Sequence, residues 1–154
     1  MDKFIVFTQG GFDKIQHEKE ALLEKRKVAV LELKNAREMG DLSENAAYKV
    51  ARATLSSIDS RLRHLSKLIR YGRIAKAPNT GKIGIGSKVL LVSNGKNIEY
   101  EIVGSYESNP TKGTISHVSP LGRVLMGKEA GEAVHVVTPN GDVTYEVINV
   151  SIAQ

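Results

Sequence analysis

Two heptad-spaced series of mostly apolar residues mirror each other about Leu42. The first series consists of Phe12, Ile15, Lys19, Leu22, Arg26, Ala29, Leu33 and Ala36. The second consists of Tyr48, Ala51, Leu55, Ile58, Leu62, Leu65 and Ile69. Spacings of three and four residues place each series on one face of a helix. Because the two faces are reflections of each other, the sequence predicts an antiparallel coiled-coil hairpin.

The ends of both predicted helices carry capping signals. Thr8 is the expected N-cap of the first helix, which should run to about Met39 and end at Gly40. The second helix is expected to start within residues 41–43 and to stop at Tyr71, before a glycine. At 1.5 Å per residue, each helix would be about 40 Å long.

Beyond a Pro- and Gly-containing boundary near residue 78, the apolar period changes to two. Strands are expected over residues 88–93, 98–104, 113–118, 133–138 and 143–150, with turns at 94–97 and 139–142. A short helix is expected over 119–128, with Ser119 as its N-cap and Pro120 in its first turn. The sequence thus predicts an α+β protein with a coiled-coil hairpin over 1–77 and a small antiparallel sheet with one helix over 78–154.

The net charge of +5 is unevenly distributed. Residues 1–77 hold nine Lys and seven Arg against four Asp and six Glu, a net +6. Residues 78–154 hold five Lys and one Arg against one Asp and six Glu, a net −1. Within residues 49–76, Asp59 is the only acid among eight basic residues. A solvated helix face usually mixes both signs, so this helix is expected to lie beside a polyanion, above all nucleic acid. The alternative is a basic surface that only keeps the protein soluble.

Several classes of protein are excluded by composition. No apolar run approaches the ~18 residues of a membrane-spanning helix, and the N-terminus turns polar too early for a signal peptide. The chain contains no cysteine, which rules out disulfides and thiolate metal sites and permits a reducing cytoplasm. Its four histidines show no ligand spacing. We therefore expect a cytoplasmic protein that contacts no membrane and has no cofactor of its own.

Two acids, Asp41 and Glu44, stand at the predicted turn. If Asp41 is the N-cap of the second helix, Glu44 occupies position N3 and the pair resembles a capping box. Alternatively, both carboxylates project from the hairpin and share a cation with a partner. Mg²⁺ is typically held by one or two carboxylates together with substrate phosphates. The two interpretations are compatible, because a cap makes rigid the acids that it uses.

Four segments resemble the bacterial Gre transcript-cleavage factors, and GreA in particular. They are residues 40–48 (GDLSENAAY), 81–89 (GKIGIGSKV), 115–128 (ISHVSPLGRVLMGK) and 138–147 (TPNGDVTYEV). The first resembles the family's hairpin tip, and the others resemble its FKBP-like C-terminal domain. The resemblance covers essentially the whole chain, in order.

The resemblance implies a factor that acts on bacterial RNA polymerase and is not itself an enzyme. The C-terminal domain would dock at the rim of the secondary channel through Val118, Ser119 and Pro120. The coiled coil would enter the channel as a monomer. Asp41 and Glu44 would help to hold the second catalytic Mg²⁺ of the polymerase active site. Cleavage of backtracked RNA would then release arrested complexes.

The resemblance also assigns roles to residues beside the two acids. Ser43, Asn45 and Tyr48 would shape the tip. Lys49, Arg52, Arg61 and Arg63 would face the nascent RNA 3′ end. The chain departs from the family at Ala47, where an acid is usual, and at Leu55, where a glutamine is usual.

Three other functions are compatible with parts of the sequence. A regulator of the same build could occupy the channel and inhibit transcription, for which Ala47 is the only hint. A peptidyl-prolyl isomerase would need an aromatic-lined pocket, but residues 78–154 contain neither Trp nor Phe. A generic coiled-coil RNA-binding protein would need the basic helix but not the acids at the tip.

Overall fold

The computed structural model describes residues 4–40 and 44–153. Asp41, Leu42 and Ser43 therefore lie outside the described residues. The chain divides into two compact units. One is the helical hairpin Phe12–Tyr71, and the other contains the residues up to Gly11 and from Gly72 onward.

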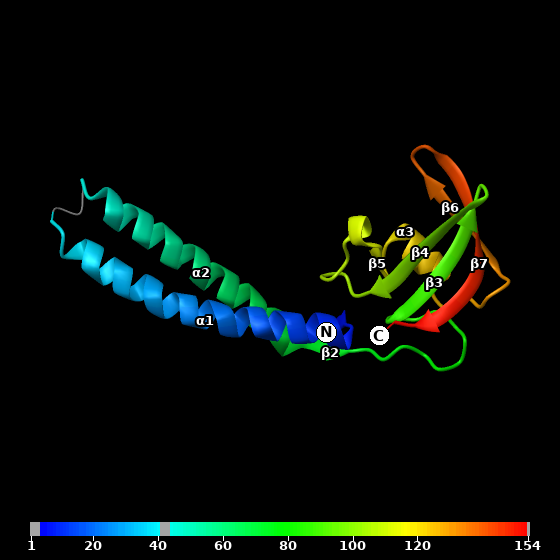
Figure 1. Ribbon diagram of the computed structural model, residues 1–154, viewed down its shortest axis with the longest axis horizontal. Helices are drawn as coiled ribbons and strands as arrows, with labels where there is room; N and C mark the ends of the chain where they lie inside the picture. Colours follow the sequence, from blue (N-terminus) through cyan, green and yellow to red (C-terminus); the bar gives the residue numbers. More distant parts are fainter. Residues whose placement is uncertain (1–3, 41–43, 154) are drawn as a thin grey trace. The chain divides into compact units, whose positions relative to one another are not determined.

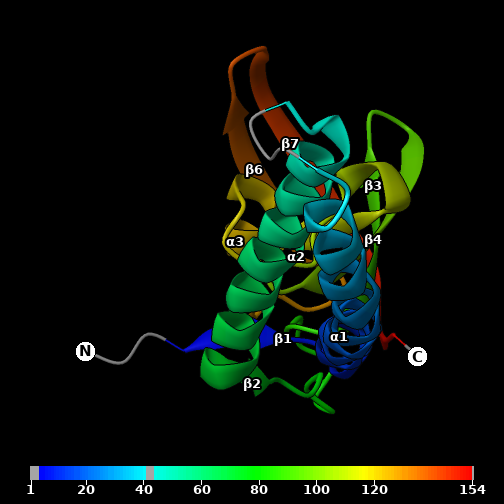
Figure 2. The same cartoon turned by 90° about the vertical axis from the view of Figure 1, so that its left-hand side faces the viewer.

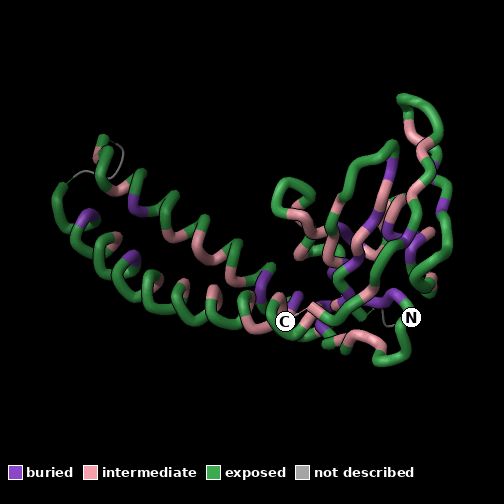
Figure 3. Tube along the Cα trace, turned by 45° about the vertical axis from the view of Figure 1, so that its right-hand side comes forward, coloured by how far each residue is buried: buried purple, intermediate pink, exposed green. Residues whose placement is uncertain are grey.

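The hairpin is formed by α1 (Gln9–Arg37) and α2 (Ala46–Tyr71), which run antiparallel and side by side (Figures 1 and 2). All the predicted seam residues are buried or half-buried, whereas most residues between them are exposed (Figure 3). The predicted coiled-coil hairpin is thus confirmed. Among the described residues, no helix is long and apolar enough to cross a membrane.

Two ion pairs join the helices beside the seam. The Arg26 guanidinium donates from Nε to Asp59 Oδ1 at 2.6 Å, so the arginine in the apolar series has a partner on α2. Arg61 binds Glu18 through two hydrogen bonds of 2.7 and 2.9 Å. Each guanidinium donates to its partner and holds the pKa of that carboxyl, Asp59 or Glu18, below its usual value. Both pairs are partly exposed to solvent, which screens the attraction between their charges, so each contributes little to stability.

The second unit contains a five-stranded sheet in the order β5-β4-β3-β7-β6. Its strands are β3 (Ser87–Ser93), β4 (Lys96–Val103), β5 (Thr114–Ser116), β6 (Ala133–Thr138) and β7 (Gly141–Ile152). The expected antiparallel pairing holds for β3–β4, β3–β7 and β6–β7, but β4 and β5 are parallel. The parallel pair arises because residues 104–113, which include a 3₁₀ turn at Pro110–Lys112, lead the chain back before β5 begins.

The two predicted turns connect the antiparallel strands. Asn94 and Gly95 form a two-residue loop in which φ is +53° and +75°, as in the turn that best fits the twist of a hairpin. The second turn places Thr138 opposite Gly141, so β7 starts two residues earlier than predicted. Elsewhere the boundaries differ from the predictions by a few residues.

The core of this unit lies between the sheet and α3 (Pro120–Leu125). It consists of Ile83, Val89, Leu91, Ile102, Ile115, Leu125, Val134 and Val147. In β3, buried Val89 and Leu91 alternate with the less buried Lys88 and Leu90, which is the period of two read from the sequence. The hydrophobic effect at these positions holds α3 against the sheet.

A short parallel sheet of β1 (Ile5–Phe7) and β2 (Gly72–Ile74) was not predicted. Each strand has three residues, and they pair across the whole hairpin, so no local pattern reveals them. Phe7 is completely buried and its ring stacks on Tyr106, with 6.4 Å between the ring centroids. The chain entering α1 is thereby anchored in the second unit.

Glu107 joins this small sheet to the loop that follows β4. Its carboxylate accepts hydrogen bonds from the Thr8 N–H (2.8 Å), the Thr8 hydroxyl and the Gly104 N–H (3.1 Å). Thr8 Oγ1 also accepts from the Gly11 N–H at 3.1 Å, which confirms Thr8 as the N-cap of α1. At Gly104, an added Cβ would lie 1.8 Å from the Val6 carbonyl oxygen, so only glycine allows this approach.

Replacing Glu107 by alanine is expected to lower the free energy of unfolding by about 1–3 kcal/mol, because donors on two segments lose their shared acceptor. Glu99→Ala is the matched control, since Glu99 forms only an exposed ion pair with Lys88. Chemical denaturation followed by circular dichroism measures both variants. Equal, small effects would contradict the role assigned to Glu107.

Candidate functional site

The distal end of the hairpin is organised by Asn45. Its side-chain Oδ1 accepts a hydrogen bond from the Tyr48 N–H at 3.0 Å, which caps the start of α2. Its Nδ2 donates to the Ala36 carbonyl at 2.6 Å, near the end of α1. One amide thus satisfies a free donor of one helix and a free acceptor of the other. The two helix ends are joined across the turn by this single side chain.

The structure corrects the predicted start of the second helix. α2 begins at Ala46, and Glu44 lies before the helix in a turn, so Glu44 is not at position N3. The capping-box interpretation of Asp41 and Glu44 is therefore wrong, because Asn45 supplies the cap. α1 likewise ends at Arg37, ahead of Gly40, whose φ is +134°.

Glu44 is exposed at the end of the hairpin and directly precedes the cap residue. Because Asn45 is held by two hydrogen bonds, the backbone from which Glu44 projects is tied to both helices. Asp41 and Ser43, also predicted for this site, lie outside the described residues. Among the residues that are described, no group of three His, Cys, Asp or Glu side chains could hold a metal ion.

Tyr48, the third residue expected to shape the tip, is half-buried. The guanidinium carbon of Arg37 lies 5.9 Å from the centroid of its ring, a cation–π distance. Arg37 was not among the residues predicted to shape the tip. Its place in the last turn of α1, next to the predicted turn, could have indicated this role. Asn45 and Tyr48 thus both connect α2 to the end of α1.

The residues predicted to face RNA do not share one face of α2. Lys49, Arg52 and Arg63 are exposed, and their separations of three, eleven and fourteen residues place them along one flank. Arg61 is two residues from Arg63, which is about 200° around the helix. It lies on the other flank, in the ion pair with Glu18.

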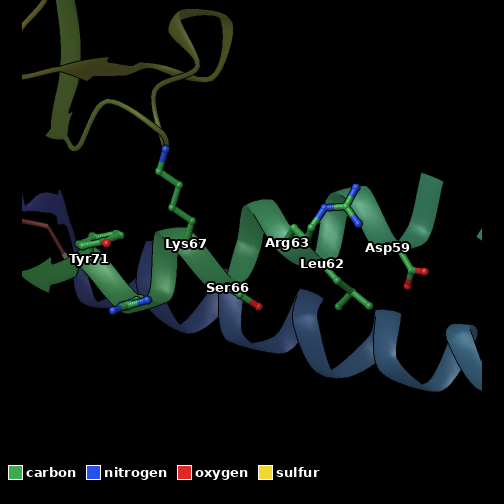
Figure 4. Close-up of a pocket in the computed structure, with 7 residues that line it drawn as sticks. Asp59, Leu62, Arg63, Ser66, Lys67 and Tyr71 are labelled. Carbon is green, nitrogen blue, oxygen red and sulfur yellow. The ribbon is translucent and has the colours of Figure 1, made fainter. Parts of the chain in front are cut away.

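The basic flank continues toward the base of the hairpin. A shallow groove of about 590 Å³ is lined there by Asp59, Leu62, Arg63, Ser66, Lys67, Arg70 and Tyr71. Figure 4 shows Arg63 and Lys67 extending away from α1, whereas Leu62 points toward it. Lys67 and Arg70 were not among the predicted RNA-facing residues, although their four- and three-residue spacing after Arg63 could have revealed them.

The second predicted surface, Val118, Ser119 and Pro120, leads into α3. Ser119 is the N-cap, as predicted: its Oγ accepts from the Gly122 N–H at 3.1 Å and donates to the Ser116 carbonyl at 2.6 Å. Val118 and Pro120 are exposed on either side of it. The cap therefore fixes how these two apolar side chains are displayed.

Comparisons with known proteins agree with this architecture. Residues 5–74 match the family described as "Transcription elongation factor, N-terminal", and residues 77–152 match "Transcription elongation factor, GreA/GreB, C-term". The chain belongs to the GreA/GreB family of transcription elongation factors.

Curated relatives match almost from end to end. Transcription elongation factor GreA of a Nitratiruptor species is 46% identical over 93% of this chain and 90% of its own length. The GreA of Lactococcus lactis subsp. lactis is 38% identical over 97% of this chain and 99% of its own length. Among solved structures, GreA factor homolog 1 (Gfh1) of Thermus thermophilus is 24% identical, with a TM-score of 0.46 over 97% of this chain and 99% of that one.

Removal of the Asn45 amide is expected to destabilise the tip. Asn45→Ala loses both hydrogen bonds and should lower the free energy of unfolding by about 1–2 kcal/mol. Asn45→Asp keeps an acceptor for the Tyr48 N–H but loses the donor to Ala36, so its loss should be smaller. Thermal unfolding followed by circular dichroism tests this order, which would be refuted if the aspartate variant were the less stable of the two.

Proposed function

We propose that this protein stimulates the cleavage of backtracked RNA by bacterial RNA polymerase and so rescues arrested elongation complexes. The observation that carries the proposal is the exposed Glu44, placed beyond the cap of α2 at the end of a hairpin about 40 Å long. A carboxylate in this position can reach into a narrow channel of another protein. Membership of the GreA/GreB family supports the proposal.

In the proposed mechanism the hairpin enters the secondary channel of the polymerase, in the bacterial cytoplasm. Asp41 and Glu44 would present two carboxylates, and Mg²⁺ is commonly held by one or two carboxylates together with phosphates and water. The metal would belong to the polymerase active site, where it would supply Lewis-acid activation of the attacking water. This chain would contribute negative charge and hold that charge in place. By itself, the chain would not cleave RNA.

The two remaining predicted surfaces have distinct proposed roles. Lys49, Arg52 and Arg63 lie along one flank and would contact the phosphates of the extruded RNA. Val118 and Pro120, displayed around the Ser119 cap, would bind the rim of the channel. These contacts would hold the factor in place as a monomer while the acids act.

The central test is RNA cleavage in a stalled, backtracked complex of polymerase. The wild-type chain should accelerate removal of the RNA 3′ end. Asp41→Asn and Glu44→Gln should each slow cleavage by about tenfold or more, which corresponds to about 1.4 kcal/mol of lost transition-state stabilisation. Binding to polymerase should be unchanged, because both substitutions keep the size of the side chain and Asn45, which caps α2, is retained.

Undiminished cleavage by the double variant would refute the proposed role of the acids. Binding that slows transcription without cleavage would support the alternative function, a channel-occupying inhibitor, for which the missing acid at Ala47 is the supporting observation.

The basic flank gives a second test, with a matched control in the same helix. Arg52→Ala and Arg63→Ala should each weaken RNA engagement and reduce the dependence of log affinity on log salt by about 0.7 per lost phosphate contact. Arg61→Ala should leave the salt dependence unchanged, since Arg61 is bound to Glu18. A salt titration of RNA crosslinking in backtracked complexes measures all three. Equal slopes for Arg61→Ala and Arg63→Ala would contradict the assignment of flanks.

A further inference from the structure

A second groove lies at the tip end of the hairpin, and it is lined neither by Glu44 nor by the residues of the basic flank. This tip groove has a volume of about 480 Å³. It is lined by Glu32, Asn35, Ala36, Met39, Ala46, Ala47, Val50, Ala51 and Thr54. Val50 is two residues from Arg52 and therefore about 200° around α2 from it. The tip groove and the basic flank are thus on opposite sides of the hairpin.

The tip groove is apolar and unusually exposed. Met39 is 73% exposed and Val50 is 67% exposed, and they are contributed by the two sides of the turn. Ala46 and Ala47 also line the groove, and each has a side chain of a single methyl group. Large apolar side chains that gather on a protein surface, rather than being scattered singly, commonly mark an interaction site. Methionine suits such a site because its side chain adapts to the shape of a partner.

The charge of the tip groove selects the kind of partner. Among the residues that the structure describes, Glu32 is the only charged one that lines it. A phosphate backbone would find no cation among them and would be repelled by Glu32. At Ala47, where the sequence analysis expects an acid in the family, this chain places a methyl group in the groove. The surface therefore fits an apolar group of a protein, with a cation near Glu32, and does not fit nucleic acid.

A second copy of the chain fits this surface less well. A stable interface between two proteins involves about 20–30 residues on each side. The tip groove offers two large apolar side chains, Met39 and Val50, and otherwise small or polar ones. It has the size for one or two inserted side chains.

We propose that the tip groove receives an apolar side chain from the protein wall of the polymerase channel, flanked by a Lys or Arg that pairs with Glu32. This inference rests on the proposed function, because it requires the hairpin to enter the channel. Two flanks of the hairpin would then bind partners. The basic flank would contact RNA, and the flank with the tip groove would contact polymerase protein. Docking of the tip groove would strengthen the binding of the hairpin within the channel.

Photocrosslinking from single positions tests which partner each flank meets. A photoreactive phenylalanine analogue replaces Ala47 in the tip groove or Ser56, which is exposed and lies about 240° around α2 from Val50. In stalled complexes, position 47 should crosslink to polymerase protein, and position 56 should not give the same protein adduct. Crosslinks from position 47 to RNA, or adducts no stronger than those from position 56, would overturn the proposal.

Concentration dependence of cleavage tests the energetic contribution of the groove. Val50→Ser and Met39→Ser should raise the half-saturating concentration of the factor by about three- to tenfold. The maximal cleavage rate at saturation should be unchanged, because both acids remain. Leu31→Ser is the control: Leu31 is 57% exposed on α1 but does not line the groove. Equal shifts for Leu31→Ser and Val50→Ser would overturn the proposal.

Three further outcomes separate this inference from its rivals. Sedimentation of the free chain that revealed a dimer, abolished by Val50→Ser, would assign the groove to a second copy and overturn the proposal. Stimulation of cleavage by the wild type, with no effect of the groove variants, would remove the inference and leave the proposed function intact. No cleavage by the wild type would count against the proposed function instead, whatever position 47 crosslinks to.

Discussion

The mutual burial of two helix faces is the constraint on which the hairpin depends. Several other apolar side chains of α1 and α2 stay exposed, so the register of the two helices follows from the faces that they bury against each other. Toward the base the seam contains Leu62 and Leu65, whereas toward the tip it contains Ala36 and Ala51 beside Leu33 and Tyr48. An alanine removes less apolar area from water than a leucine does, so the two alanine positions contribute less hydrophobic stabilisation. The Asn45 hydrogen bonds join the helices at that end.

This arrangement suits the proposed function, in which the hairpin presents charge at its end. A carboxylate on a frayed turn would sample many positions, and fixing it on a partner would then cost conformational entropy. Here the residue after Glu44 is tied to both helices, so part of that cost is met during folding. The packed helices also determine which of the basic side chains beside the seam form ion pairs. Arg26 and Arg61 form ion pairs across the helices, while Arg63 and Lys67 extend outward along the basic flank (Figure 4).

Much of the fold could be predicted from the sequence because it depends on local periodicity. The seam residues, the turn at Asn94 and Gly95, and the caps at Thr8 and Ser119 are encoded by residues a few positions apart. The parallel sheet of β1 and β2 could not be predicted, since its strands are three residues long and pair across the entire hairpin. The interpretation of Asp41 and Glu44 as a capping box failed for a related reason. Both Asp41 and Asn45 are good N-caps, and the choice of Asn45 depends on the Ala36 carbonyl, which only the packed hairpin brings within reach.

The sequence by itself determined the class of protein, the antiparallel pairing of the helices and the presence of acids at the turn, because each follows from residue type and spacing along one chain. Tertiary structure decided which of the charged side chains are available. Arg61 and Arg63 are indistinguishable by type and lie two positions apart, yet one is bound to Glu18 and the other extends away from α1. That difference arises from which residue of α1 lies opposite each of them, a relation that exists only once the helices pack.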